Sequence, residues 1–124
     1  MSEQKARETI EKYIEAFNAQ DVPKMVDSLN FPFSWIINST VRPVFKASDF
    51  VSPTGTLIEQ EGWHHTGLDL VEPVQVWDTK AHFKVIYSRF KMDQTKYITH
   101  EALWIITAPK GHWGIQCMSL YIPS

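Results

Sequence analysis

The strongest constraint on the fold is an asymmetry along the chain. From Leu68 onward the sequence is almost all alternating, aromatic-rich segments typical of β-strands, whereas the first third has helical periodicity. A long curved sheet has to be covered, and helices that precede it can cover one face. Such an arrangement tends to leave a cavity between helices and sheet. We therefore predict an α+β fold with a pocket.

Length and composition agree with one globular domain covering residues 1–124. A chain of this size buries about two-thirds of the surface that its unfolded form exposes. Hydrophobic residues make up 44% and charged residues 21% of the sequence, which excludes general disorder. The net charge is −2 and the basic residues are scattered, so no basic patch indicates nucleic-acid binding.

The sequence also bears on cellular location. No apolar run approaches the roughly 20 residues of a membrane span. The first residues, MSEQKARETIEKY, lack the apolar middle of a signal peptide. The single cysteine, Cys117, excludes an internal disulfide. We expect a cytoplasmic protein that does not bind membranes.

Three helices are expected in the first half. The first has an apolar stripe and a possible cap at Ser2; the stripe comprises Ala6, Ile10, Tyr13, Ile14 and Phe17. Asp21, followed by Pro23, starts a short second helix that the segment Phe31-Pro32-Phe33 should end. Ser48-Asp49-Phe50 is a plausible cap before a third helix, whose main body we place at residues 56–61 with Gly62 as its end.

The strands are expected at residues 33–37 and 41–45, with Pro43 placing the second at an edge, and then in a long meander. The meander comprises residues 68–77, bulged near Pro73, and residues 81–91, 96–108 and 113–122.

Turn lengths predict which side chains share a face of the meander. A three-residue turn at 92–94 places Tyr87 opposite Thr99, and a two-residue turn at 110–111 places Trp104 opposite Cys117. Tyr87, Arg89, Glu101 and Gln116 then share one face. Both faces are rich in apolar residues, so we expect a homodimer that covers the second face through Trp104, Ile115 or their neighbours.

The predicted polar cluster on an apolar face is a candidate ligand site. Buried polar groups must be satisfied by each other, by water or by a ligand. The helix and the segment at residues 63–66 should enclose the same cavity. The candidate ligand-binding residues are Tyr13, Trp63, Tyr87, Arg89, Glu101 and Gln116. A buried ion pair explains the polar cluster around Glu101 equally well, and Tyr13 is more simply a core residue with a satisfied hydroxyl.

Candidate acid–base residues are His64 and His65, with Asp69 or Glu101 as a supporting carboxylate. Adjacent strand residues point to opposite faces, so at most one of the two histidines can face a pocket. A histidine bonded to backbone at the start of a strand is the simpler interpretation, and it is favoured.

We expect no metal, because the five histidines lack the spacing of recognised zinc sites. We also expect no cofactor. The five tryptophans and seven phenylalanines suit a small apolar or aromatic ligand, although core packing explains them more simply. Cys117 lies between apolar neighbours, and we expect it to be unreactive.

The order of elements resembles the nuclear transport factor 2-like superfamily, a cone of three helices packed on a strongly bent sheet. The resemblance rests on Tyr13, Phe17-Asn18-Ala19 and Asp21, and on Trp113-Gly114-Ile115-Gln116. Uncharacterised bacterial members are more similar still. That likeness rests on Asn30-Phe31-Pro32, on Gly62-Trp63-His64-His65-Thr66 with Asp69, and on Arg89, Asp93, Glu101 and Leu103.

The chain departs from that pattern at Phe33 and Trp35, where such relatives often carry His and Arg, and at Gln94, where a turn glycine is usual. The resemblance implies a fold and a pocket, whereas the superfamily includes both enzymes and binding proteins. Two functions remain open: a small-molecule-binding protein, or a cofactor-free lyase or isomerase of the dehydratase, ketosteroid-isomerase or polyketide-cyclase type.

Overall fold

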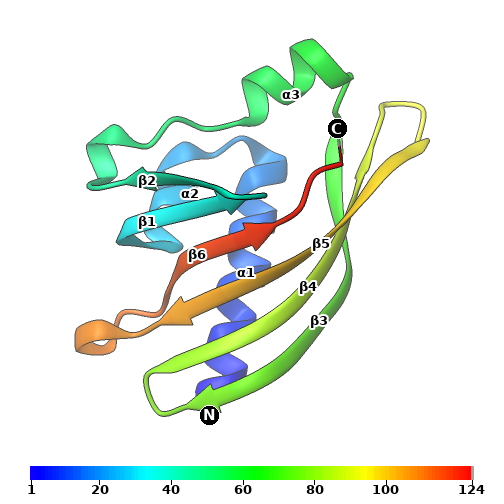
Figure 1. Cartoon of the computed structure of the whole chain (residues 1–124). Helices are drawn as coiled ribbons and strands as arrows, with labels where there is room; N and C mark the ends of the chain where they lie inside the picture. The colour runs from blue at the N-terminus through cyan, green and yellow to red at the C-terminus, as the bar shows by residue number, and fades with distance from the viewer. Residues whose placement is uncertain (124) are drawn as a thin grey trace.

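The computed structural model describes residues 1–123, which form an α+β fold with helices packed on a six-stranded sheet. The sheet order is β2-β1-β6-β5-β4-β3, and its neighbours are antiparallel except for the parallel pair β1–β6. Helix α1 runs along one face of the curved sheet (Figure 1). The elements are α1 (Ser2–Ala19), α2 (Val22–Asp27), β1 (Leu29–Ile37), β2 (Thr40–Val44), α3 (Thr54–Glu61), β3 (His65–Trp77), β4 (Lys80–Phe90), β5 (Lys96–Thr107) and β6 (Gly114–Leu120).

Helix α1 buries the predicted apolar stripe, because its members recur at helical spacing and face the sheet. Ile10 and Ala6 are fully buried, and Phe17 is 7% exposed. The predicted cap at Ser2 is wrong. Met1 takes the cap position, and the Ser2 hydroxyl donates instead to the backbone oxygen of Asp78 at 2.9 Å.

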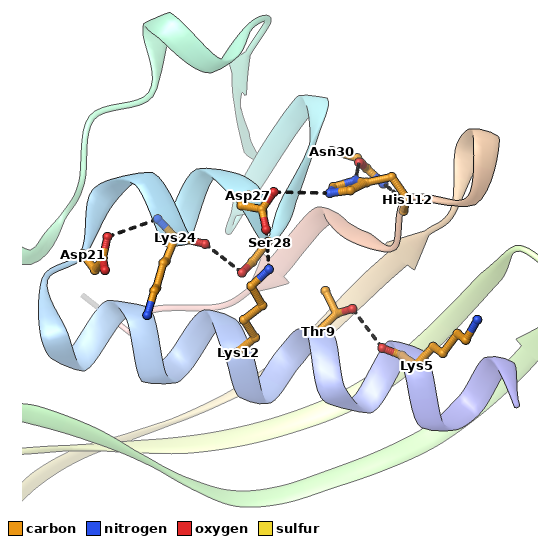
Figure 2. Close-up of polar contacts among 9 residues, drawn as sticks. All are labelled: Lys5, Thr9, Lys12, Asp21, Lys24, Asp27, Ser28, Asn30 and His112. Atoms are coloured by element: carbon orange, nitrogen blue, oxygen red, sulfur yellow. Dashed lines mark hydrogen bonds and ion pairs between the residues drawn. The ribbon is translucent and has the colours of Figure 1, made fainter.

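Asp21 caps α2 as predicted, since its carboxylate accepts from the backbone N–H of Lys24 at 3.2 Å. The chain leaves the helix at Ser28, before the Phe31-Pro32 segment that was expected to end it. Figure 2 shows how α2 is fixed: Lys12 of α1 pairs with Asp27, which lies 3.8 Å from His112 Nε2. The hydrogen bond from Lys12 lowers the pKa of Asp27.

The third helix is close to the prediction. Residues Ala47–Asp49 form a single 3-10 turn rather than a helix cap, and α3 starts at Thr54. Gly62 ends α3 in the left-handed region, with φ of 70°, as predicted. Gln94 also has a positive φ, 72°, at the position where a turn glycine would be usual.

The strands lie near their predicted places. β2 is an edge strand that contains Pro43, and β3 has an irregularity between Pro73 and Gln75. β1 and β3 start earlier than expected, because Leu29 and His65 already pair with neighbouring strands.

The predicted register between β4 and β5 is wrong by one residue. Arg89 pairs with Ile98 and Phe90 with Lys96, so Tyr97 is an extra, bulged residue. Tyr87 therefore lies opposite His100 rather than Thr99. Because neighbouring residues point to opposite faces, this one bulge turns the whole of β5 over relative to the prediction.

A second bulge lies between β5 and β6. Ile106 pairs with Ile115 and Ile105 with Cys117, which leaves Gln116 as the extra residue. Beyond it, Trp104 lies opposite Met118 rather than Cys117. Trp104 and Ile115 are therefore in the core, 3% and 0% exposed, and the prediction that they lie between subunits is wrong.

Candidate functional site

A cavity of about 310 Å³ lies between α1 and the sheet. All layers of the fold contribute to its wall. Helix α1 and the loop before α3 supply Tyr13, Ile14, Phe17, Val51 and Pro53. The sheet and the segment after it supply Trp35, Ile37, Arg42, Pro43, Val44, Thr66, Tyr87, Arg89, Trp104, Met118, Leu120 and Ile122. Arg42, Pro43 and Val51 are exposed, so the cavity meets solvent beside edge strand β2.

Three aromatic side chains form one wall of the cavity. The ring of Tyr13 meets that of Trp104 edge-on, with centroids 5.9 Å apart, and the rings of Tyr87 and Trp104 are 6.2 Å apart. Helix α1, which carries Tyr13, packs on the curved sheet against β4 and β5, which carry Tyr87 and Trp104 (Figure 1). The indole N–H of Trp104 is buried and has no hydrogen-bond acceptor among the described residues.

Arg89 is the cation that lies beside Tyr87 in this wall. Its guanidinium lies over the Tyr87 ring, 5.9 Å from the centroid, and its Nη1 donates to Glu61 at 3.3 Å. Tyr97 donates to the same Glu61 oxygen at 2.8 Å. Burial and this carboxylate together raise the pKa of Tyr97 to about 12. Glu61, at the end of α3, therefore fixes both side chains.

The two cavity tyrosines remain protonated at neutral pH. Burial raises the pKa of Tyr13 well above its ordinary value, and the nearby Tyr87 acts in the same direction. Burial also raises the pKa of Tyr87, against the opposing effect of Arg89. Both phenol groups can therefore donate a hydrogen bond.

Sequence reasoning missed Trp104 and His100 as members of this region. His100 is 2% exposed, and its ring lies 5.5 Å from that of Tyr87. Burial lowers the pKa of His100, so it is held neutral. Both residues are on β5, so placing them correctly from the sequence would have required recognising the bulge at Tyr97.

Three of the six predicted ligand-binding residues line the cavity, namely Tyr13, Tyr87 and Arg89. Trp63 lies outside the cavity wall. Its ring centroid is 5.2 Å from that of Phe17, and its Nε1 donates to the Thr66 hydroxyl at 2.9 Å. Gln116 is elsewhere, since its amide donates to the backbone oxygen of Pro32 at 2.6 Å.

Glu101 points away from α1. It lies on the outer face of the sheet, where its side chain is 68% exposed and 3.4 Å from Lys84. The prediction that it shares a face with Tyr87 is wrong, because the bulge at Tyr97 shifts the register before it.

The candidate acid–base residues lie outside the cavity wall. His64 is exposed and its ring nitrogen contacts that of His65 at 3.1 Å, while His65 stacks on Phe90 at 4.6 Å. The backbone N–H of His64 donates to Phe90 at 2.8 Å. Asp69 accepts from Ser88 and lies 3.8 Å from Lys96.

A metal-binding cluster and a membrane-spanning helix are both absent from residues 1–123. Among residues 1–123, no three His, Cys, Asp or Glu side chains gather as they would around a metal ion. No helix in that range has the length and apolar character to cross a membrane. Burial raises the pKa of the Cys117 thiol.

Comparison with solved structures identifies the fold. A protein of unknown function from Shewanella oneidensis, described as nuclear transport factor 2-like, superposes with a TM-score of 0.77 over 98% of this chain and 100% of that one, at 11% identity. A nuclear transport factor 2-like protein with a cystatin-like fold from Novosphingobium aromaticivorans gives 0.76 over 98% and 81%, also at 11% identity. This chain therefore has the nuclear transport factor 2-like fold, as its sequence predicted.

A third structure, from Catenulispora acidiphila, was solved in complex with S-DNPA. It gives a TM-score of 0.70 over 93% of this chain and 88% of that one, at 7% identity. No family model and no curated protein matches the sequence. At these identities the comparisons establish the fold and leave the function to be argued from the cavity.

Proposed function

We propose that this protein binds a small apolar or aromatic molecule in the cavity between α1 and the sheet. The observation that carries the proposal is the cavity wall, which is mainly aromatic and aliphatic and encloses about 310 Å³. Ligand pockets in proteins are typically concave, mostly apolar and of about 300–1,000 Å³, with a few polar groups that orient the ligand. Tyr13, Tyr87, Thr66 and Arg89 are such groups here.

The comparisons support the proposal in one respect. A protein with the same fold was solved in complex with S-DNPA, so this fold is compatible with holding another molecule. At 7% identity that complex gives no information on the ligand of this chain.

The alternative, a lyase or isomerase, requires an acid and a base beside the bound substrate. The four residues considered for those roles, His64, His65, Asp69 and Glu101, are absent from the cavity wall formed by residues 1–123. Nor does any other carboxylate or imidazole line that wall. Binding without turnover is therefore the function that the site supports best.

A fluorescence titration with N-phenyl-1-naphthylamine, a neutral apolar dye, tests the proposal. Leu120→Trp should block binding because Leu120 lines the cavity and the larger ring would fill it. Leu103→Trp is the matched control, since Leu103 lies on the neighbouring strand, 39% exposed and outside the cavity wall.

We expect the wild-type protein and Leu103→Trp to bind the dye equally, and Leu120→Trp to bind it at least 10-fold more weakly. Circular dichroism would establish that both variants are folded. No binding by the folded wild type, or equal binding by the two variants, would contradict the proposal.

A further inference from the structure

The inner wall of the cavity has an excess of hydrogen-bond donors. Tyr13, Tyr87, Arg89 and Trp104 line it, and each carries N–H or O–H groups. The ring of Trp104 lies 5.9 Å from that of Tyr13 and 6.2 Å from that of Tyr87, and the Arg89 guanidinium lies 5.9 Å from the Tyr87 ring. Since both phenols remain protonated at neutral pH, they can donate. An acceptor-rich ligand would match this wall.

Two of these donors are buried without an acceptor. Trp104 is 3% exposed, and within residues 1–123 neither its Nε1 nor the Nε of Arg89 has a hydrogen-bond partner. Buried polar groups in proteins almost always have partners, and each exception needs an explanation. Both groups belong to residues that line the same cavity, and each of the two residues lies beside the ring of Tyr87.

The charges around the cavity favour an anion. Arg89 and Arg42 are the two ionisable cations of its wall, and among the described residues that wall includes no carboxylate. Glu61 accepts from Nη1 of Arg89, while Nε of the same guanidinium has no acceptor within residues 1–123. Arginine binds a carboxylate through two parallel N–H groups, and Nε with the second Nη is one such pair.

We propose that the ligand is an amphipathic carboxylate whose acid group accepts hydrogen bonds from Arg89 and Trp104, while its apolar body lies against the aliphatic wall. This inference rests on the proposed function, because it names the class of molecule that the same cavity binds. The size of the cavity, about twice the roughly 150 Å³ that holds benzene, fits an acid with two fused rings. Arg42 at the mouth attracts the anion toward the cavity.

The test compares 2-naphthoate with 2-naphthalenemethanol, a neutral molecule with the same rings, by isothermal titration calorimetry at pH 7. We expect the wild type to bind the acid at least 10-fold more tightly than the alcohol, as charge-assisted hydrogen bonds would give. Arg89→Gln should abolish this preference, so that the variant binds the acid no more tightly than it binds the alcohol.

Trp104→Phe is the second variant, because it removes the indole N–H and keeps an aromatic ring. It should reduce the preference for the acid even if Arg89→Gln fails to fold. Lys84→Gln is the control, since Lys84 is a cation on the outer face of the sheet, paired with Glu101. It should leave both affinities unchanged.

The outcomes separate the two proposals. If the alcohol or N-phenyl-1-naphthylamine binds and the acid has no advantage, the carboxylate inference is overturned and the proposed function stands. The same holds if the preference persists in both Arg89→Gln and Trp104→Phe. If none of the three probes binds the folded wild type, both proposals are overturned.

Discussion

Among the glycines, Gly114 is the one at which an added Cβ would meet the shortest contacts. A Cβ at this position would lie 2.7 Å from the backbone carbon of Leu29 and 2.8 Å from Cγ of Asn30. Asn30 is itself fixed, because its amide donates to Thr107 at 2.9 Å and to His112 at 3.0 Å. Leu29 and Asn30, at the start of β1, pack against the start of β6 and therefore have no room to move aside.

We predict that Gly114→Ala lowers the free energy of unfolding by about 1–3 kcal/mol, the usual cost of overpacking a filled site. Gly55→Ala is the matched control, since a Cβ there meets nothing within 4 Å and the residue lies in α3. It should be neutral or stabilising by up to about 1 kcal/mol. Urea denaturation measures both, and equal effects would contradict the packing described here.

His100 makes a second prediction at this scale, on the dependence of stability on pH. Burial, with a smaller contribution from Arg89, lowers its pKa, while Glu61 acts in the opposite direction. The unfolded chain then takes up a proton at a higher pH than the folded protein does. Stability from this residue is complete above its ordinary pKa of 6.5 and is lost as the pH falls through the folded value.

The measurement is urea denaturation of the wild type and His100→Gln between pH 7.5 and pH 5. The wild type should lose more stability over this range than the variant does. Parallel curves for the two proteins would show that His100 does not contribute.

At the scale of the elements, helix α1 is what the sequence predicted best, because helical periodicity is a local property. Its stripe faces the sheet, and Phe17 packs between Tyr13 and Trp63, with ring centroids 5.9 Å and 5.2 Å away. Phe17→Ala should lower the free energy of unfolding by about 3–5 kcal/mol, since it leaves a cavity among these rings. Thermal and urea denaturation would measure it, and a loss below about 1 kcal/mol would contradict the packing.

The bounds of the strands could be predicted from the sequence, but their pairing register could not. Their existence and approximate bounds follow from alternation and turn residues, which are local, but register depends on bulges, which are not. Two bulges, at Tyr97 and Gln116, each shift the pairing by one residue. Their effects cancel between β4 and β6, so these two strands keep the relation to each other that the turn lengths predict.

Strand β5 lies between the two bulges, and its faces were predicted the wrong way round. This single difference moved Glu101 out of the candidate site and brought Trp104 and His100 toward it. Half of the predicted ligand-binding residues came from α1 and β4, which lie before the first bulge, and these are the ones that line the cavity. The aromatic character of the cavity was thus predictable, while the partners of Arg89 were not.

At the scale of the whole molecule, the outer face of the sheet is left without helices, and a homodimer through it remains a prediction. The residues expected at the interface change with the corrected register. Leu103, 39% exposed, and the half-buried Ile86, Ile105 and Cys117 are now the apolar candidates. Ion pairing of Lys84 with Glu101 supplies polar contacts on the same face.

Sedimentation velocity at micromolar concentration should show a dimer of the wild type. Leu103→Glu should shift it toward monomer, because it places a charge in the apolar contact. Val41→Glu is the control, since Val41 is 58% exposed on edge strand β2 and should leave the dimer intact. A monomeric wild type would contradict the prediction.

The central claim is that the cavity between α1 and the sheet is a ligand-binding site. A crystal structure of the protein grown with 2-naphthoate tests it most directly. The account predicts electron density for the fused rings between Tyr13, Leu120 and Trp104, with the carboxylate within hydrogen-bond distance of Arg89. Density for 2-naphthoate found only on the outer face of the sheet, beside Lys84 and Leu103, would contradict it.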